Sequence, residues 1–342
     1  MLWFVGMGIS GYDSIPSQAV KVLSDADIIY MEQFTSPISD IELAKIKKMS
    51  HGEFHIAKRW FVEDGSEILK NAKKNDVVLL SYGDPYVATT HTELRTRATR
   101  ENIKICTIHA SSSLTSLIGE CGLHFYKIGR IATVMSDAES LTTPYYVIYK
   151  NIIEGNHTVL LLEYNQDKDF FLDPKDALHN LLRTEDGQQR HVLSPATFAI
   201  VASRVGQIKQ GIMCGNISSL LDADFGMPPH TIIIPARLHF TESDALKATS
   251  ICLDEPQDNI TEKISTQMMK KYVPMIREAL EEVKACCTAG EHKMILENAE
   301  LYIRDAERFL EDGQDEVAVL SIGYADGLVD ALRIQKGLGP KM

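Results

Sequence analysis

The stretch that decides the fold of this chain is DVVLLSYGDPYVATTH, residues 76–91. Val77–Leu80 is an apolar run with the length of a buried strand, and it stops at Gly83-Asp84-Pro85, a turn that carries the chain out of the sheet. A helix is predicted to follow from Thr89 to Asn102. Because ligands bind at the carboxyl ends of strands in open α/β sheets, this loop is a predicted ligand site, although an ordinary strand-to-helix turn has a similar pattern.

Length and charge narrow the class of protein. The 342 residues leave room for two or three domains, and 44% hydrophobic with 24% charged residues is ordinary for a globular enzyme. The formal net charge is −12, from 47 acidic and 35 basic side chains. Such an excess of acid disfavours direct nucleic-acid binding through phosphate contacts.

Cysteine spacing and the N-terminus indicate the compartment. The six cysteines form no Cys-x-x-Cys pair and no Cys/His spacing typical of zinc, so we expect no metal site. Met1–Val5 has no basic leader and is interpreted as a first strand. No uncharged apolar run approaches the ~18 residues that a membrane helix needs. A cytoplasmic protein without membrane association is expected.

Apolar runs and helical patterns alternate through the first three quarters of the chain, which predicts an α/β architecture. We place an N-terminal α/β lobe at residues 1–110 and a C-terminal α/β lobe at residues 111–253, with the boundary at Ser111–Ser113. The predicted strands are Leu2–Ile9, Ile28–Met31, Val77–Leu80, Ile103–Ile108, Arg130–Met135, Thr158–Leu162, Thr197–Ser203 and Thr231–Pro235; the predicted helices are Ser17–Asp25, Glu67–Lys73, Pro144–Glu154, Pro174–Thr184 and Glu242–Ser250.

The pattern changes beyond residue 253. Residues 254–263 are polar and contain a proline, which predicts a linker, and residues 264–342 are predicted to form an all-α helical bundle of three helices. Breaks are expected at Thr288-Ala289-Gly290 and Asp312-Gly313, and Pro274 indicates a first helix that is kinked or begins late. The apolar stripes are Ile264, Met268, Tyr272, Met275, Ala279 and Val283; Ile295, Ala299, Tyr302, Ala306 and Phe309; and Val317, Leu320, Tyr324, Leu328 and Ala331.

A glycine pattern after the first strand has two interpretations. Gly6-x-Gly8-x-x-Gly11, with Glu32 at the end of the second strand, matches a dinucleotide-binding fingerprint. In such a site the glycine turn opens directly into a helix, but here Tyr12–Pro16 intervenes. A tight turn beside a ligand without phosphates is therefore favoured over a nicotinamide-dependent enzyme.

Two further segments are candidate walls of a site. His109–Ser113 follows a predicted strand and either caps the next helix or forms the second wall of the cleft that begins at Gly83-Asp84-Pro85. His230 follows two prolines and precedes another strand, where it is a site residue or only a turn residue. No nucleophile triad and no phosphate-binding P-loop motif is found, which favours chemistry supplied by a reactive cofactor.

These motifs resemble the diphthine synthase family. The resemblance covers residues 1–253 and is carried by Leu2–Gly8, Leu79–His91, His109–Ser113, Gly122–Lys127 and Phe225–His239. It implies the two-lobed tetrapyrrole-methylase fold, S-adenosylmethionine as cofactor with S-adenosylhomocysteine as product, and commonly a homodimer. It also implies methylation of the amino group on the modified histidine of elongation factor 2, the protein substrate.

The resemblance also implies cofactor contacts. Tyr82 stands where the family has proline, and Ser111-Ser112-Ser113 replaces Pro-Ser-Ile, which puts the side-chain contacts of Ser113 in question. No dedicated acid–base residue is expected: Asp84 would orient the cofactor, while Tyr82 and Tyr86 are candidates for an aromatic contact with the growing ammonium or are packing residues. The implied cofactor-binding residues are Ile9, Asp84, Val87, Ser112, Ser113, Leu162, Val205 and His230.

Alternatives remain for the activity and for the tail. Within the fold, a methylase of cobalamin or sirohaem precursors is the nearest rival, and a non-catalytic adaptor acting through the tail is the rival from another class. The tail resembles a small archaeal helical domain without assigned function. Docking, dimer support or recruitment of an unknown partner are open for it, as are the oligomeric state and the number of methyl groups transferred.

Overall fold

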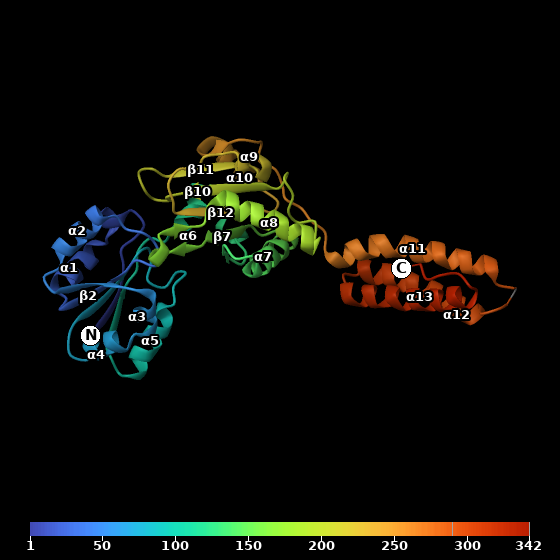
Figure 1. Ribbon diagram of the computed structural model, residues 1–342, viewed down its shortest axis with the longest axis horizontal. Coiled ribbons are helices and arrows are strands. Elements are labelled where there is room, and N and C mark those ends of the chain that lie inside the picture. The colour runs from blue at the N-terminus through green and yellow to red at the C-terminus, as the bar shows by residue number, and fades with distance from the viewer. Residues whose placement is uncertain (289, 342) are drawn as a thin grey trace. The chain divides into compact units, whose positions relative to one another are not determined.

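The computed structural model describes residues 1–288 and 290–341. It divides into two compact units, Met1–Ile260 and the residues from Thr261 onward, which we call the first and second units (Figure 1). Two separate sheets form the first unit, and three helices form the second. The α/β fold followed by a helical bundle is therefore confirmed.

The first sheet is entirely parallel, with strand order β3-β2-β4-β1-β5. Its strands are β1 (Leu2–Gly6), β2 (Ile28–Glu32), β3 (Glu53–Ala57), β4 (Val77–Ser81) and β5 (Ile105–Ile108). The connecting helices are η1 (Gly11–Ser14), α1 (Ser17–Asp25), α2 (Asp40–Met49), α3 (Arg59–Asp64), α4 (Ser66–Ala72) and α5 (His91–Arg100).

Strand β4 shows why the first sheet carries helices on both faces. Successive side chains of a strand point to opposite faces. Val77 and Leu79 pack with apolar residues of α3, α4 and α5, while Val78 and Leu80 pack with α1 and α2. A strand buried on both sides has a continuous apolar sequence, which is the run that the sequence shows.

The second sheet is mixed, with strand order β13-β11-β10-β12-β7-β6. Only β6–β7 and β11–β13 are parallel pairs. Its strands are β6 (Ala132–Val134), β7 (Thr158–Leu162), β10 (Phe198–Ser203), β11 (Gly211–Asn216), β12 (His230–Ile234) and β13 (Ile251–Cys252), and a separate hairpin pairs β8 (Tyr164–Asn165) with β9 (Phe170–Phe171).

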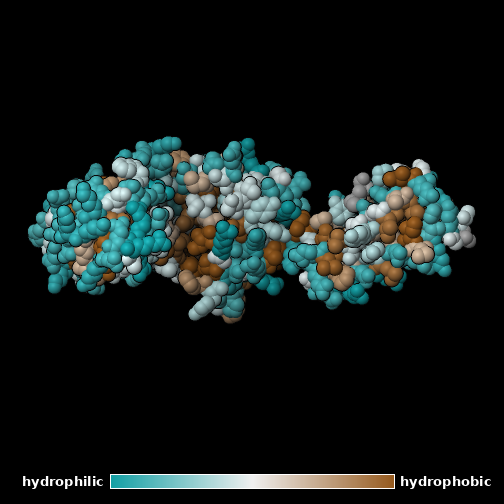
Figure 2. All heavy atoms as spheres, turned by 90° about the horizontal axis from the view of Figure 1, so that it is seen from below, coloured by the Kyte–Doolittle hydropathy of each residue, from teal (hydrophilic) through white to brown (hydrophobic). Residues whose placement is uncertain are grey.

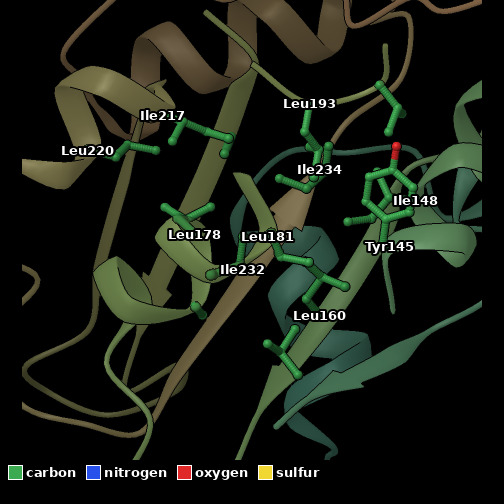
Figure 3. Packing of buried hydrophobic residues seen from close by; sticks show 14 of the residues in the cluster. Tyr145, Ile148, Leu160, Leu178, Leu181, Leu193, Ile217, Leu220, Ile232 and Ile234 are labelled. Atoms are coloured by element: carbon green, nitrogen blue, oxygen red, sulfur yellow. The ribbon is translucent and has the colours of Figure 1, made fainter. Parts of the chain in front are cut away.

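Helices cover both faces of the second sheet as well. On one face Tyr145 and Ile148 of α7 pack with Leu178 and Leu181 of α8 against Ile232 (Figure 3). On the other face lie apolar residues of α6 and α10. The helices of this lobe are α6 (Ser113–Glu120), η2 (Phe125–Lys127), η3 (Glu139–Leu141), α7 (Thr142–Ile153), η4 (Gln166–Lys168), α8 (Pro174–Gln188), α9 (Ile217–Leu221) and α10 (Phe240–Thr249).

The second unit contains α11 (Ile264–Cys286), α12 (Lys293–Glu311) and α13 (Asp315–Gln335). Pro274 lies inside α11, which begins ten residues earlier, so a late start for this helix is wrong. Ala289 of the predicted break lies outside the described residues. Both α11 and α12 pack on α13.

The apolar stripe predicted for α13 is not the buried one. Val317, Leu320 and Tyr324 are 40%, 59% and 57% exposed, and buried positions include Ala318 and Ala325. Ile322, Val329 and Leu332 complete the buried stripe, so the face that packs carries small and large apolar residues and lies beside the predicted one. Figure 2 accordingly shows hydrophobic patches among hydrophilic side chains on this unit.

The beginning of the predicted linker packs on the second sheet. The Asn259 side chain is 8% exposed. Its Nδ2 donates to the carbonyls of Phe198 (2.8 Å) and Pro235 (2.7 Å), and its Oδ1 accepts from the Phe198 amide (2.9 Å). Asp258 accepts from the Leu238 amide at 2.8 Å. The first unit therefore extends to Ile260.

A truncation pair tests this extension. A chain ending at Ile260 should unfold at the thermal midpoint of the first unit in the full protein, whereas a chain ending at Asp254 should be less stable by roughly 2 kcal/mol or more, because it leaves buried groups of Phe198 without partners. Calorimetric unfolding of both chains measures the difference, and Asn259→Ala in the full chain should shift the midpoint in the same direction. Equal midpoints for the two truncations would contradict the packing role of Asn259.

Among the described residues, no helix is long and apolar enough to cross a membrane. Across the same part of the chain, no group of three or more His, Cys, Asp or Glu side chains is arranged to hold a metal ion.

Candidate functional site

A cavity of about 760 Å³ lies between the two lobes of the first unit. Its volume is typical of small-molecule sites. Residues of both lobes line it, from the loop after β4, the start of α6, the ends of β7 and β10, and the β8–β9 hairpin. The lining includes seven of the eight predicted cofactor residues, namely Asp84, Val87, Ser112, Ser113, Leu162, Val205 and His230.

The first lobe builds its wall from two crossing turns. The Gly8 amide donates to the Gly83 carbonyl with an N···O distance of 3.2 Å, and the Gly83 amide donates to the Gly8 carbonyl at 2.9 Å. Both glycines have a positive φ, 78° for Gly8 and 71° for Gly83. A Cβ on Gly6 would lie 2.5 Å from the Gly83 carbonyl oxygen, which is closer than atoms can pack. Glycine is required at Gly6 because the turns touch backbone to backbone.

Asp84 ties the loop after β4 to the loop after β5. Its Oδ2 accepts from His109 Nδ1 at 2.7 Å and from the Ala110 amide at 3.4 Å, and its Oδ1 accepts from the Tyr86 amide at 3.0 Å. The side chain is 8% exposed, and it lines the cavity. With both oxygens engaged, Asp84 orders the wall of the cavity.

The serines after β5 serve two roles. Ser112 is the N-cap of α6, its hydroxyl accepting from the Leu114 amide at 3.3 Å, so the capping interpretation is correct. Both Ser112 and Ser113 also line the cavity. Ser112 can therefore cap α6 and line the cavity at the same time.

Ile9 lies behind the wall. It is absent from the lining of the cavity and 5% exposed, its carbonyl accepts the hydroxyl of Tyr82, and a Cβ on Gly206 would meet its side chain at 2.4 Å. The structure thus places Ile9 beneath the loop after β10. The contact between Ile9 and the cofactor that the resemblance implies stays a prediction, and Ile9 is the one of the eight residues outside the cavity lining.

Only one of the two candidate tyrosines lines the cavity. Tyr82 does so, and Gln207 of the second lobe donates to its hydroxyl at 3.0 Å. Burial raises the pKa of the Tyr82 phenol, so it stays protonated. Tyr86 packs on Phe4, with ring centroids 5.5 Å apart, and its hydroxyl is 3.0 Å from Thr107 Oγ1. The aromatic role predicted for Tyr86 has no support from this placement.

The second lobe brings its residues together through strand direction. Leu162 ends β7, and Val205 follows the end of β10, while β12 runs antiparallel to both, so its first residue, His230, lies at the same edge. Both ring nitrogens of His230 are buried without a hydrogen-bond partner. Burial lowers the pKa of His230, which keeps the ring neutral.

Glu32 does not serve a ribose. Its carboxylate is fully buried and accepts from the amides of Phe34 (3.1 Å), Thr35 (3.1 Å) and Tyr82 (3.3 Å). Helix α1 begins at Ser17, after η1 and Pro16, so no helix N-terminus opens from the glycine turn. The glycines form a tight turn, as predicted, and not a dinucleotide-binding fingerprint.

Several other lining residues were not predicted from the sequence. Arg59 and Arg204 line the cavity, and so does the β8–β9 hairpin, which reaches the first lobe. There Lys58 Nζ lies 2.8 Å from Asp167 Oδ1, and Gln166 donates to Gln33 at 3.1 Å. The position of Arg204 directly after a predicted strand is the one feature that could have drawn notice.

Comparisons with known proteins agree with this geometry. Diphthine synthases of Methanococcus maripaludis strain C7 and Methanocaldococcus jannaschii are each 34% identical, over 250 and 252 residues, which is 72% of this chain and 98% of each relative. A crystal structure of diphthine synthase superposes with a TM-score of 0.66 at 30% identity and covers 73% of this chain and 96% of its own.

Two family matches divide the chain. The tetrapyrrole (corrin/porphyrin) methylases match residues 1–220, and a protein family of unknown function, DUF357, matches residues 271–338. The resemblance of both parts is confirmed. The chain therefore belongs to the tetrapyrrole (corrin/porphyrin) methylase family and is a methyltransferase of its diphthine synthase group.

Proposed function

We propose that this protein transfers methyl groups from S-adenosylmethionine to the amino group of the modified histidine of elongation factor 2, a step of diphthamide biosynthesis. The observation that supports it most is the gathering of seven residues from five separate segments around one cavity. The relatives that match 98% of their own length are named diphthine synthases, which does not favour a methylase of cobalamin or sirohaem precursors.

The residues present fit the cofactor. A Cβ at Gly83 would meet only the Ser111 carbonyl, at 3.8 Å, so the backbone is open to a ligand. The unpartnered ring nitrogens of His230 are free to bond one. Asp84, Val87, Ser112 and Ser113 would hold the cofactor from the first lobe, and Leu162, Val205 and His230 from the second. When bound, S-adenosylmethionine supplies a methyl group on a sulfonium that is its own leaving group.

The chain supplies position for the reactants. Walls from two lobes hold a reacting amine in one orientation, and orientation of this kind contributes about 7–11 kcal/mol in favourable cases. The neutral ring of His230 places no repelling charge beside a sulfonium. Asp84 is engaged by His109 and two amides, and Tyr82 keeps its proton, so neither is available as the base that removes a proton from the amine.

Mass spectrometry tests the activity. Elongation factor 2 that carries the modified histidine should gain one or more methyl groups after incubation with this protein and S-adenosylmethionine, and the mass gain gives their number. A uroporphyrin-type substrate serves as the comparison. Methylation of the porphyrin in place of the elongation factor, or cofactor binding without any transfer, would refute the proposal.

Cofactor choice can be checked apart from turnover. We expect S-adenosylhomocysteine to bind with measurable heat in titration calorimetry and NAD to give none, because Glu32 is buried and the glycine turn offers no helix N-terminus to a pyrophosphate. Repeating the NAD titration with S-adenosylhomocysteine already bound controls for NAD binding elsewhere on the protein. Saturable NAD binding with no heat from S-adenosylhomocysteine would reverse the assignment.

A further inference from the structure

Arg204 is a cation in the cavity wall that nothing so far uses. It follows β10 directly, its backbone has a left-handed φ of 50°, and its amide donates to the Pro229 carbonyl at 2.9 Å. Its Nη1 reaches the Pro228 carbonyl only at 3.5 Å, and its Nε is buried without a hydrogen-bond partner. A left-handed backbone costs about 1–2 kcal/mol for a residue other than glycine, so the placement of this side chain is imposed by its surroundings.

No carboxylate of the described residues pairs with Arg204. The three carboxylates that line the cavity have other partners: Asp84 pairs with His109 at 2.7 Å, Asp167 with Lys58 at 2.8 Å, and Glu163 accepts from the Ser136 hydroxyl at 2.7 Å. Arg204 is half-buried with its Nε atom buried, and a guanidinium that is partly removed from water without a counter-ion is unfavourable. The protein therefore maintains a positive group in the cavity that its own acids do not neutralise.

A more deeply buried arginine shows the usual arrangement. Arg333 in the second unit is 9% exposed, forms an ion pair with Glu282, and donates through Nε to the Gly339 carbonyl at 2.9 Å. The guanidinium of Arg204 has the same donors as that of Arg333, but its Nε has no acceptor in the protein. The acceptor that fits both guanidinium nitrogens is a carboxylate, which binds them in two parallel hydrogen bonds.

The neighbours of Arg204 are residues that line the cavity, so an acceptor for its guanidinium would belong to a ligand of the cavity. Val205 follows it in sequence, and Ser203, which precedes it, pairs with His230 in the sheet. Val205 and His230 both line the cavity. The positive charge also acts on the Tyr82 phenol, which lies in the wall of the first lobe. The guanidinium is thus within the part of the cavity assigned to the cofactor and the reacting group.

We propose that Arg204 binds a carboxylate of a cavity ligand. The inference rests on the proposed function, and it leaves two sources for the same chemistry: the amino-acid end of the cofactor, or a carboxylate beside the reacting amine of the protein substrate. In either case Arg204 is a positioning residue that fixes one end of a reactant relative to the S–CH₃ bond.

The experiment compares three ligands on four proteins. S-adenosylhomocysteine, methylthioadenosine, which lacks the amino-acid end, and modified elongation factor 2 are tested on the wild type, Arg204→Gln, Arg204→Lys and Arg183→Gln. Arg183 is an exposed residue of α8 outside the cavity lining, and its replacement controls for loss of one positive charge. Thermal midpoints of all four show which variants are folded.

Arg204→Gln should weaken one ligand by roughly 10–100-fold, the range for a lost charge-assisted pair, with Arg204→Lys between it and the wild type. If the cofactor supplies the carboxylate, affinity for S-adenosylhomocysteine falls and that for methylthioadenosine does not. If the substrate supplies it, KM for elongation factor 2 rises while S-adenosylhomocysteine binds normally. Should Arg204→Gln fail to fold, the same comparisons are made with Arg204→Lys.

Two results would overturn the inference. One is binding of all three ligands within twofold of the wild type in both Arg204 variants. The other is an equal loss for S-adenosylhomocysteine and methylthioadenosine, which indicates a distorted wall. Failure of the wild type itself to bind S-adenosylhomocysteine or to methylate elongation factor 2 would refute the proposed function instead.

Discussion

Replacing Glu242 by glutamine should lower the free energy of unfolding of the first unit by about 3–5 kcal/mol, the cost of breaking a buried charge network. The Glu242 side chain is 0% exposed and accepts four hydrogen bonds. The donors are the His124 amide (2.7 Å), the His239 amide (2.7 Å), Lys127 Nζ (2.6 Å) and His157 Nε2 (3.0 Å). An amide would present its own N–H groups to some of these donors.

The network fixes three segments of the second lobe to one another. Lys127 belongs to η2, His157 precedes β7, and Glu242 lies in the first turn of α10. His157 Nδ1 accepts from the Ala236 amide at 3.0 Å, so the proton of the neutral ring is on Nε2, which donates to Glu242. Burial lowers the pKa of His157 and keeps it neutral. Glutamine keeps one acceptor oxygen, so the buried His157 Nε2 and the two amides compete for it, while Lys127 retains the Arg237 carbonyl at 2.6 Å.

Urea unfolding of the wild type and the variant measures this effect. Glu255→Gln is the matched control, because Glu255 pairs with Lys247 at 2.5 Å on the surface and is 83% exposed, and its loss should change stability by less than about 1 kcal/mol. A Glu242→Gln protein with the wild-type midpoint would contradict the importance of the network.

The network around Glu242 should also make the stability of the first unit depend on pH in the acid range. Burial by itself raises the pKa of Glu242, but hydrogen bonds from Lys127, His239 and His124 outweigh burial and bring it to about 2. A depressed carboxyl pKa stabilises the fold above the ordinary value of 4.5, and this contribution is lost as the pH falls from 4.5 toward 2. The lowered pKa of His157 destabilises the fold below about pH 6.5 in the same direction. Glu242→Gln should therefore flatten the acid limb of the stability curve.

Asp84→Ala should weaken binding of S-adenosylhomocysteine by at least about 10-fold, with methyl transfer falling in parallel. The change removes the acceptor shared by His109, Ala110 and Tyr86, so two loops of the cavity wall lose their connection. Charge-assisted hydrogen bonds of this kind contribute about 1.5–3 kcal/mol each. Calorimetry and single-turnover rates report the two effects separately.

Asp84→Asn distinguishes positioning from chemistry. The amide keeps an oxygen for the Tyr86 amide, and His109 can accept from its nitrogen in the other tautomer, so most binding and transfer should survive. Normal binding with transfer reduced by orders of magnitude in Asp84→Asn would assign Asp84 a role in the transition state and disprove the positioning role.

Residues 76–91 allowed the first sheet to be predicted because a strand buried on both faces has an unmistakable apolar run. The same rule fails for two strands. The edge strand β3 is mostly exposed, and β11, between β13 and β10, carries glycine at Gly211 and Gly215, so neither has the pattern of a buried strand. Their places depend on neighbouring strands that are distant in sequence. In α13 the periodicity was present, but it selected the exposed face.

The candidate site shows a similar division. Asp84 and Ser112 could be predicted because each follows a strand within a short motif. Arg204 and the β8–β9 hairpin could not, because their significance comes from what they face across the cavity. Ile9 lies close to the glycine turn in sequence, but Tyr82 and Gly206 cover it.

The two edges of the cavity differ in how they can separate. At one edge Gln207 of the second lobe donates to the Tyr82 hydroxyl and Ser10 donates to the Gly206 carbonyl, and both hydrogen bonds are partly buried. At the hairpin edge the lobes meet through Lys58 and Asp167, which are 57% and 68% exposed, and through Gln33 and Gln166. Salt screens an exposed ion pair and leaves buried hydrogen bonds almost unaffected. Added salt should therefore weaken the Lys58–Asp167 contact at the hairpin edge more than the partly buried hydrogen bonds at the other edge.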